Sequence, residues 1–221
     1  MSRSPFFSVV IPTYNSEKLL KKALRSVMNQ TYSDFEIIIV DNFSKDSTKK
    51  IVKSFSDNRI RFVEINNNGV IALSRNKGIE LSNGEWIAFL DSDDIWLSKK
   101  LEEVKDVIIN HHSAIGVCHN EWLVINGKRK SKLIYGPTKN NNLYAHLLFE
   151  RNCMSTSAVC IKKNIAVKAK GFSTRNDFVT AEDYEFWIRL SKEGEIFFID
   201  NVLGEWHKHG ENYSDNVDLR V

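Results

Sequence analysis

Three carboxylates stand within four residues, directly after an apolar segment. Asp91, Asp93 and Asp94 follow residues 86–90, which read Trp-Ile-Ala-Phe-Leu. Like charges this close raise one another's pKa unless a cation neutralises them. Because Mg²⁺ and Mn²⁺ prefer oxygen ligands, the pattern predicts a divalent metal held by Asp91 and Asp93. The alternative is that Ser92, Asp93 or Asp94 caps the next helix.

A second acidic pair, Glu182 and Asp183, opens a helical pattern that covers residues 181–193. Neighbouring side chains on a helix point about 100° apart, so only one of the two can face straight into a cleft. We expect that one to be Asp183, which could act as a general base. The alternative is a capping box between Thr180 and Asp183, and both roles can hold at once.

Two basic side chains could join these acids in the expected fold. His209 follows a predicted strand at 202–206 and could bind a metal or donate to a phosphate, although a surface histidine without a role is the alternative. Arg75 lies in a predicted helix at 71–81 and could pair with a phosphate or a carboxylate, or simply be exposed. Gly78 in the same helix permits close packing.

Apolar segments alternate with helical patterns in the first half of the chain. The predicted strands are 7–11, 35–40, 60–65 and 86–90, and the predicted helices are 17–28, 46–55, 71–81 and 97–110. Continuous apolar strands that alternate with helices indicate a parallel sheet covered on both faces, with its ligand site at the carboxyl ends of the strands. Tyr14, Asn15, Asp41 and Asn42 should therefore meet the acidic cluster there.

The second half has a different pattern, typical of mixed α+β structure. Extended segments are expected at 115–118, 122–125, 157–161, 196–199 and 202–206, with an Asn126-Gly127 turn and the helix at 181–193. No Pro/Gly linker or repeat separates the halves. We therefore expect one domain over 1–221, with a first half at 1–110 and a second at 111–221.

Composition bounds the environment of the protein. The chain has 221 residues, 42% of them hydrophobic, and a net charge of +3 from 31 basic and 28 acidic residues that are mostly interleaved, so nucleic acid is not an expected partner. The three cysteines, Cys118, Cys153 and Cys160, lack paired spacing and are predicted to be reduced core thiols. Without a signal-like start or a long apolar run, we expect a cytoplasmic protein. The basic segment 128–132 is the expected contact if the protein binds the membrane face peripherally.

The order of the motifs resembles the inverting family 2 glycosyltransferases with the GT-A fold. The matching segments are residues 9–15 (Val-Val-Ile-Pro-Thr-Tyr-Asn), 39–44 (Ile-Val-Asp-Asn-Phe-Ser), 74–78 (Ser-Arg-Asn-Lys-Gly), 89–94 (Phe-Leu-Asp-Ser-Asp-Asp) and 182–187 (Glu-Asp-Tyr-Glu-Phe-Trp). The match is dense over the first hundred residues and then rests on Glu182-Asp183 and His209. The resemblance implies an α/β GT-A fold with a mostly parallel central sheet, a nucleotide-sugar-binding half and an acceptor-side half.

The resemblance also implies an activity and a set of site residues. The enzyme would move a sugar from a nucleotide diphosphate donor, a UDP-sugar by family preference, to a hydroxyl of a glycan or lipid-linked glycan acceptor in surface polysaccharide assembly, such as lipopolysaccharide or capsule. Asp183 would be the catalytic base, and Asp93, Asp91 and His209 would hold Mn²⁺ or Mg²⁺. The donor would contact Pro12, Thr13, Tyr14, Glu17, Asp41, Asn42, Arg75, Asp91 and Ser92. A homodimer and peripheral membrane contact are left open.

Other functions fit the motifs less well. In a haloacid-dehalogenase-like phosphatase the Asp-x-Asp follows the first strand, not the fourth, and a nucleotidyltransferase needs a glycine-rich loop where this chain has residues 12–15. A Rossmann dehydrogenase is excluded because no Gly-x-Gly-x-x-Gly follows the first strand. A non-catalytic nucleotide-sugar-binding protein is the main alternative.

The chain departs from the family pattern at Phe43, where glycine or aspartate is more frequent, and many relatives continue beyond the position of Val221.

Overall fold

The computed structural model describes residues 4–137 and 142–209. The strands are β1 (Phe7–Thr13), β2 (Phe35–Asp41), β3 (Ile60–Glu64), β4 (Trp86–Phe89), β5 (Ile95–Trp96), β6 (Ala114–Ile125), β7 (Lys128–Leu133), β8 (Val159–Lys162) and β9 (Glu195–Lys208). The helices are α1 (Glu17–Met28), α2 (Thr48–Lys53), α3 (Ile71–Leu81), α4 (Lys100–Asn110), α5 (Leu143–Phe149), α6 (Lys163–Lys168) and α7 (Glu182–Leu190), with 3₁₀ turns at Thr156–Ala158 and Asn176–Phe178.

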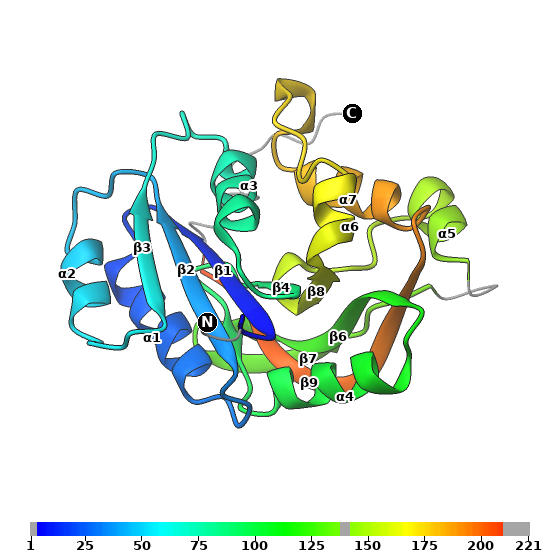
Figure 1. The fold of residues 1–221 in the computed structure, drawn as a ribbon, viewed down its shortest axis with the longest axis horizontal. Coiled ribbons are helices and arrows are strands. Elements are labelled where there is room, and N and C mark those ends of the chain that lie inside the picture. Colours follow the sequence, from blue (N-terminus) through cyan, green and yellow to red (C-terminus); the bar gives the residue numbers. More distant parts are fainter. Residues whose placement is uncertain (1–3, 138–141, 210–221) are drawn as a thin grey trace.

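The described strands form one mixed sheet in the order β3-β2-β1-β4-β8-β6-β9-β5, with β7 paired to β6 (Figure 1). β1 to β4 run parallel, as the alternation of strands and helices predicts. β8 is antiparallel to both β4 and β6, while β6 and β9 are parallel to each other. The expected fold, a parallel first half joined to a mixed second half, is therefore confirmed.

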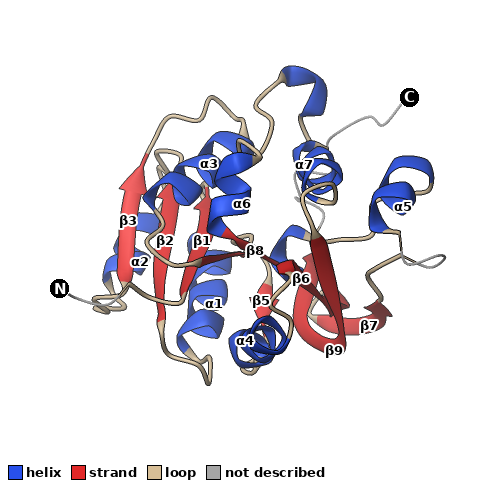
Figure 2. Ribbon diagram, turned by 45° about the vertical axis from the view of Figure 1, so that its right-hand side comes forward, coloured by secondary structure: helices blue, strands red, loops and turns tan. Residues whose placement is uncertain are grey.

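Alternate residues of the central strands face two separate cores. Val9 and Ile11 of β1 pack in a core with residues of α1 and α4, whereas Val10 packs in a second core with residues of α3 and α7. Successive strand side chains point to opposite faces, so a strand buried on both faces is apolar throughout. Figure 2 shows α1 and α3 on opposite faces of the sheet.

Close packing of α3 on β1 depends on Gly78. A Cβ added there would lie 2.2 Å from Cγ1 of Val10, far inside van der Waals contact. The predicted role of Gly78 in close helix packing is therefore confirmed.

The second half contains longer strands than the sequence predicts. Residues 115–118 and 122–125 belong to one strand, β6, and residues 196–199 and 202–206 to another, β9. Register shifts between these two strands absorb the polar residues that interrupt the apolar pattern. The predicted Asn126-Gly127 turn is confirmed, with φ of 51° and 71°, values that a two-residue hairpin turn of this kind requires.

Two further expectations concern the core and the surface. All three cysteines are buried and free, which confirms the prediction of reduced core thiols. The basic segment 128–132 forms the exposed strand β7. None of the helices in residues 4–137 and 142–209 has both the length and the apolar character that a membrane span requires.

Candidate functional site

A cleft of about 860 Å³ opens at the carboxyl ends of β1, β2 and β4. Residues from both halves of the chain line it, which agrees with the expected position of a ligand site in an open α/β sheet. The predicted site residues among its lining are Pro12, Thr13, Tyr14, Asn42, Arg75, Asp91, Ser92, Asp93, Asp183 and His209. The structure thus brings together residues that the sequence places up to almost two hundred positions apart.

Two predicted nucleoside contacts, Asp41 and Glu17, are not among the residues that line the cleft. The Asp41 side chain is fully buried and accepts hydrogen bonds from the backbone N–H and the hydroxyl of Ser44. Glu17 accepts a hydrogen bond from the backbone N–H of Ser47 at 3.0 Å. Both carboxylates therefore hold the 41–47 loop in place.

Phe43, in the same loop, has a φ of 51°, a conformation that glycine adopts more readily.

Arg75 lies between two carboxylates from distant parts of the chain. Its Nη1 donates to Oε1 of Glu182 at 2.6 Å, and its Nη2 donates to both oxygens of Asp91, at 2.8 and 3.1 Å. The Arg75 residue is only 4% exposed, and the two carboxylates raise its pKa despite burial. The alternative that Arg75 is only an exposed arginine on a helix is therefore wrong. Arg75 instead joins α3, the acidic turn after β4 and the start of α7.

Of the three predicted metal ligands, Asp93, Asp91 and His209, the structure brings Asp93 and His209 into contact. Nε2 of His209 lies 3.0 Å from Oδ2 of Asp93, and about a quarter of each side chain is exposed to the cleft. Burial and the neighbouring Asp91 carboxylate raise the pKa of Asp93. Asp91 is occupied by Arg75, and the described residues contain no group of three or more acidic, histidine or cysteine side chains arranged to hold a metal.

Asp94 has a different role from its two neighbours because it is 3% exposed. Its Oδ2 accepts a hydrogen bond from the Ser157 hydroxyl at 2.5 Å, and its Oδ1 accepts one from the backbone N–H of His207 at 2.9 Å. Burial and the nearby carboxylate of Asp93 raise the pKa of Asp94 well above its usual range. None of these acids caps a helix, since α4 begins only at Lys100, after β5. The capping alternative for the acidic cluster is therefore excluded.

Asp183 lies in the first turn of α7 and faces the cleft. Its Oδ1 accepts the backbone N–H of Tyr184 at 2.7 Å, and the Thr156 hydroxyl lies 3.4 Å from its Oδ2. Burial raises the pKa of Asp183 to about 6, although the Arg75 guanidinium opposes this shift. No side chain makes a capping hydrogen bond at the helix start, so the expected capping box with Thr180 is not formed.

Several cleft residues were not predicted from the sequence. Asn67 follows β3, is 6% exposed and donates to the Ser74 hydroxyl at 2.8 Å. The second half of the chain adds Leu133, Tyr135, Met154, Ser155, Thr156, Glu182 and Trp206. The position of Asn67 after the third strand is a signal that could have identified it, because the other strand ends carry site residues. The remaining residues lie in segments whose partners only the folded sheet determines.

Buried charged groups lie behind the wall of the cleft. Burial lowers the pKa of Lys100 to about 7 and raises that of Glu121 to about 7. The Lys100 Nζ lies 3.2 Å from the centre of the Trp96 ring, a cation–π contact. Oε2 of Glu121 accepts a hydrogen bond from the Tyr135 hydroxyl at 2.9 Å. Through Tyr135, this buried carboxylate reaches the cleft surface.

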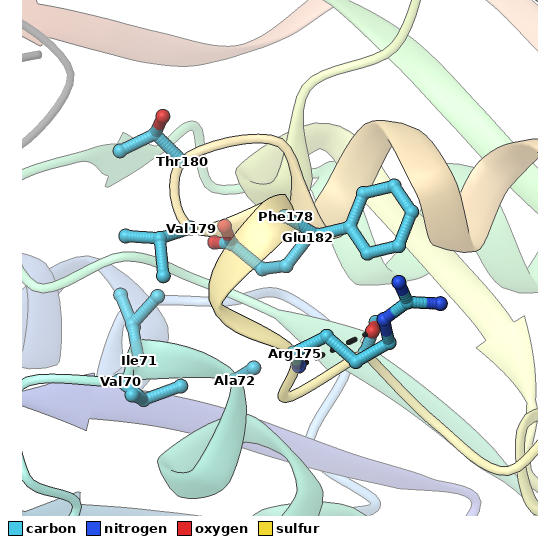
Figure 3. A pocket seen from close by; sticks show the side chains of 9 residues that line it. Val70, Ile71, Ala72, Arg175, Phe178, Val179, Thr180 and Glu182 are labelled. Atoms are coloured by element: carbon cyan, nitrogen blue, oxygen red, sulfur yellow. Dashed lines mark hydrogen bonds between the residues drawn. The ribbon is translucent and has the colours of Figure 1, made fainter.

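A much smaller pocket lies beside the cleft (Figure 3). Its volume is about 10 Å³, room for a single water molecule, so it is not a second ligand site. Figure 3 shows Val70, Ile71 and Ala72 at the start of α3 opposite Val179 and Thr180, and Glu182 also lines this pocket. Thr180 has a φ of 74°, an unfavourable value for a β-branched residue, directly before the turn that carries Asp183.

Comparison with known proteins agrees with this geometry. The family model described as glycosyl transferase family 2 matches residues 8–173, which include the acidic turn and most of the cleft-lining loops. The chain belongs to glycosyl transferase family 2. The expected family is therefore confirmed, and with it the expectation that the protein is a glycosyltransferase.

Two bacterial relatives resemble this family 2 chain over most of its length. TuaG of Bacillus subtilis, a protein named as a teichuronic acid biosynthesis glycosyltransferase, is 28% identical over 215 residues, which are 96% of this chain and 82% of TuaG. The Escherichia coli UDP-Glc:alpha-D-GlcNAc-diphosphoundecaprenol beta-1,3-glucosyltransferase WfgD is 30% identical over 189 residues, which are 86% of this chain and 71% of WfgD.

Solved structures share the fold of this family 2 chain. The structure of S. aureus TarS 1-349 in complex with UDP-GlcNAc matches with a TM-score of 0.79 and 23% identity. The match covers 96% of this chain and 61% of the TarS chain. The mannosyltransferase PcManGT of Pyrobaculum calidifontis, in complex with GDP-Man and Mn²⁺, matches with a TM-score of 0.72 and 17% identity. This match covers 96% of this chain and 59% of the PcManGT chain. The chain thus spans less than two thirds of these solved chains, and the likeness confirms the GT-A fold.

Proposed function

We propose that this protein transfers a sugar from a UDP-sugar to a hydroxyl of a lipid-linked glycan during cell-surface polysaccharide synthesis, with inversion at the anomeric carbon. The observation that carries the proposal is that the acidic turn with the Asp93–His209 pair and the Asp183 carboxylate line one cleft. A displacement with inversion needs a leaving-group site and a base that face one sugar from opposite sides.

In this reaction Asp183 acts as the general base. Its carboxylate takes the proton of the acceptor hydroxyl while that oxygen attacks the anomeric carbon. The bond between this carbon and the diphosphate oxygen breaks, and UDP leaves with the bonding electrons. One displacement inverts the anomeric centre, so a donor with an α linkage gives a β-linked product. A pKa of about 6 leaves Asp183 ionised and basic at neutral pH.

The nucleotide lies at the ends of the first strands. Pro12, Thr13, Tyr14 and Asn42 form this part of the cleft, and Tyr14 is 53% exposed, which leaves its ring free to contact a base. In this proposal Asp41 and Glu17 act by holding the 41–47 loop. The names of TarS, bound to UDP-GlcNAc, and of WfgD, which uses UDP-Glc, support UDP as the nucleotide. WfgD is also named for a lipid-linked acceptor, diphosphoundecaprenol-bound GlcNAc.

Asp93 and His209 are the proposed ligands of Mn²⁺ or Mg²⁺. Their carboxylate oxygen and imidazole nitrogen are 3.0 Å apart, about a quarter of each side chain is exposed, and both atom types are ligands that these ions accept. Asp91 is outside this proposed ligand set because both of its oxygens accept hydrogen bonds from Arg75. When bound, the metal would neutralise negative charge on the departing diphosphate.

Thermal unfolding with nucleotides tests the proposal. UDP, GDP, dTDP and CMP are each added to the wild type with Mn²⁺ or with EDTA, because a ligand that binds only the folded state raises the melting temperature. We expect a shift with UDP that needs Mn²⁺ and disappears in Asp93→Asn. The matched control is Asp106→Asn, an exposed acid of α4 outside the cleft, which should keep the shift. A shift with none of the nucleotides would contradict the proposed function, and a shift with GDP alone would contradict UDP as the donor nucleotide.

A further inference from the structure

Glu121 is a buried carboxylate that no step of the proposed reaction uses. The residue is completely buried on β6, against β9. Space for its carboxylate exists because residue 204 is glycine: a Cβ added there would lie 2.9 Å from Oε1 of Glu121. Burying a carboxylate is costly unless it is hydrogen-bonded, so its partners indicate what it stabilises.

One residue of the cleft wall, Tyr135, is such a partner. The Tyr135 hydroxyl donates to Oε2 of Glu121 at 2.9 Å, whereas Oε1 of Glu121 has no hydrogen-bond partner among the described residues. Tyr135 and Ser155 are both half-buried and line the cleft. The Tyr135 hydroxyl has a single proton, and the Glu121 carboxylate takes it. What the Tyr135 oxygen can still offer a ligand is therefore an acceptor lone pair.

The position of Tyr135 and Ser155 in the cleft indicates which part of a ligand they would contact. Ser155 begins the segment 155–157, which joins the two ends of the reaction centre. Ser157 accepts the backbone N–H of Asp91 and donates to Asp94, while the Thr156 hydroxyl lies 3.4 Å from the Asp183 carboxylate. The transferred sugar must lie between the acidic turn and the base, and so it lies along this segment. An acceptor oxygen such as that of Tyr135, whose proton is held by a carboxylate, suits sugar hydroxyl or amide N–H donors and disfavours phosphate.

We propose that Tyr135 binds the transferred sugar of the donor by accepting a hydrogen bond from one of its hydroxyl or amide groups, and that Glu121 is the positioning residue that orients the Tyr135 hydroxyl. This assignment rests on the proposed function. It predicts that the Tyr135 hydroxyl, oriented by Glu121, contributes to the affinity for a UDP-sugar and contributes nothing to the affinity for UDP.

Isothermal titration with UDP, UDP-glucose and UDP-N-acetylglucosamine, each with Mn²⁺ at pH 8, tests the assignment. Tyr135→Phe keeps the ring and removes the hydroxyl, and Glu121→Gln keeps the shape but lets an amide N–H donate to Tyr135. In both variants we expect the Kd of the better UDP-sugar to rise about three- to tenfold, the effect of one lost hydrogen bond, with the Kd of UDP unchanged within about twofold. Tyr144→Phe on α5, outside the cleft lining, is the matched control and should change neither constant.

The other outcomes overturn the assignment in distinguishable ways. Equal weakening of UDP and UDP-sugar would mean that the residues support the cleft as a whole, and unchanged binding of both would mean that Tyr135 does not touch the sugar. If the wild type binds neither UDP nor a UDP-sugar, the proposed function fails and the assignment fails with it. A melting temperature for Tyr135→Phe within a few degrees of the wild type establishes that the variant is folded.

Discussion

The backbone N–H of His207 donates to Oδ1 of Asp94 at 2.9 Å, which joins the end of β9 to the acidic turn after β4. The two residues are 113 positions apart in the chain. Because His209 lies two residues further along the same backbone, this bond helps to hold the His209 side chain beside Asp93. Asp94 is thus a positioning residue for the proposed metal pair.

A comparison of two substitutions at this position tests that role. Asp94→Ala removes both hydrogen bonds of the side chain and should lower the free energy of unfolding by about 1–3 kcal/mol, because the Ser157 hydroxyl and the His207 N–H lose their acceptor. It should also abolish most of the Mn²⁺-dependent thermal shift with UDP. Asp94→Asn keeps the oxygen that His207 needs and should retain most of the shift. Equal loss in both variants would indicate that the charge of Asp94, not its hydrogen bonds, matters.

Asp183→Asn removes the proposed base while keeping the size of the side chain. We expect kcat for sugar transfer to fall about 10²- to 10⁴-fold, the usual contribution of a general base, because asparagine cannot take the acceptor proton. The measurement is release of UDP from a UDP-sugar with an acceptor glycan. Binding of UDP with Mn²⁺ should change little, which separates a lost base from a lost donor site. Full activity in Asp183→Asn would assign the base elsewhere.

The pH dependence of the reaction should follow Asp183. Burial raises its pKa from 3.8 to about 6, and only the ionised carboxylate can accept a proton. The wild-type kcat should therefore be constant above pH 7 and fall about tenfold per pH unit below pH 6. A profile of kcat at saturating UDP-sugar between pH 5 and 8 checks this expectation. A decline that begins only near pH 4 would mean that the base has the pKa of an exposed aspartate.

Gly78→Ala should destabilise the fold without touching the cleft chemistry. The new methyl carbon would lie 2.2 Å from Cγ1 of Val10, so α3 must move away from β1. We expect a loss of about 1–3 kcal/mol in the free energy of unfolding, measured with urea. The double variant with Val10→Ala should recover part of this loss relative to the sum of the single variants, because the clash is with the Val10 side chain. Strictly additive losses would contradict the clash.

Much of the first half could be predicted from the sequence because its structure is local and repetitive. The helices α1 and α3 have the predicted bounds, and the strand ends carry the predicted polar residues. In the second half, the sequence predicts two short strands where β9 is continuous. The physical reason is that its polar residues lie at register shifts against β6, and pairing with that distant strand compensates the weak local pattern.

The sequence by itself determined the family, the parallel first half and most of the side-chain types that line the cleft at the strand ends, because motifs at strand ends reflect local geometry. Only the tertiary structure decided what each acid does. Asp91 pairs with Arg75, Asp93 meets His209, and Asp94 is buried under the end of β9, although all three carboxylates stand within four residues. A carboxylate has no fixed role until burial and its partners set its charge and contacts, and these partners come from strands and helices distant in the chain.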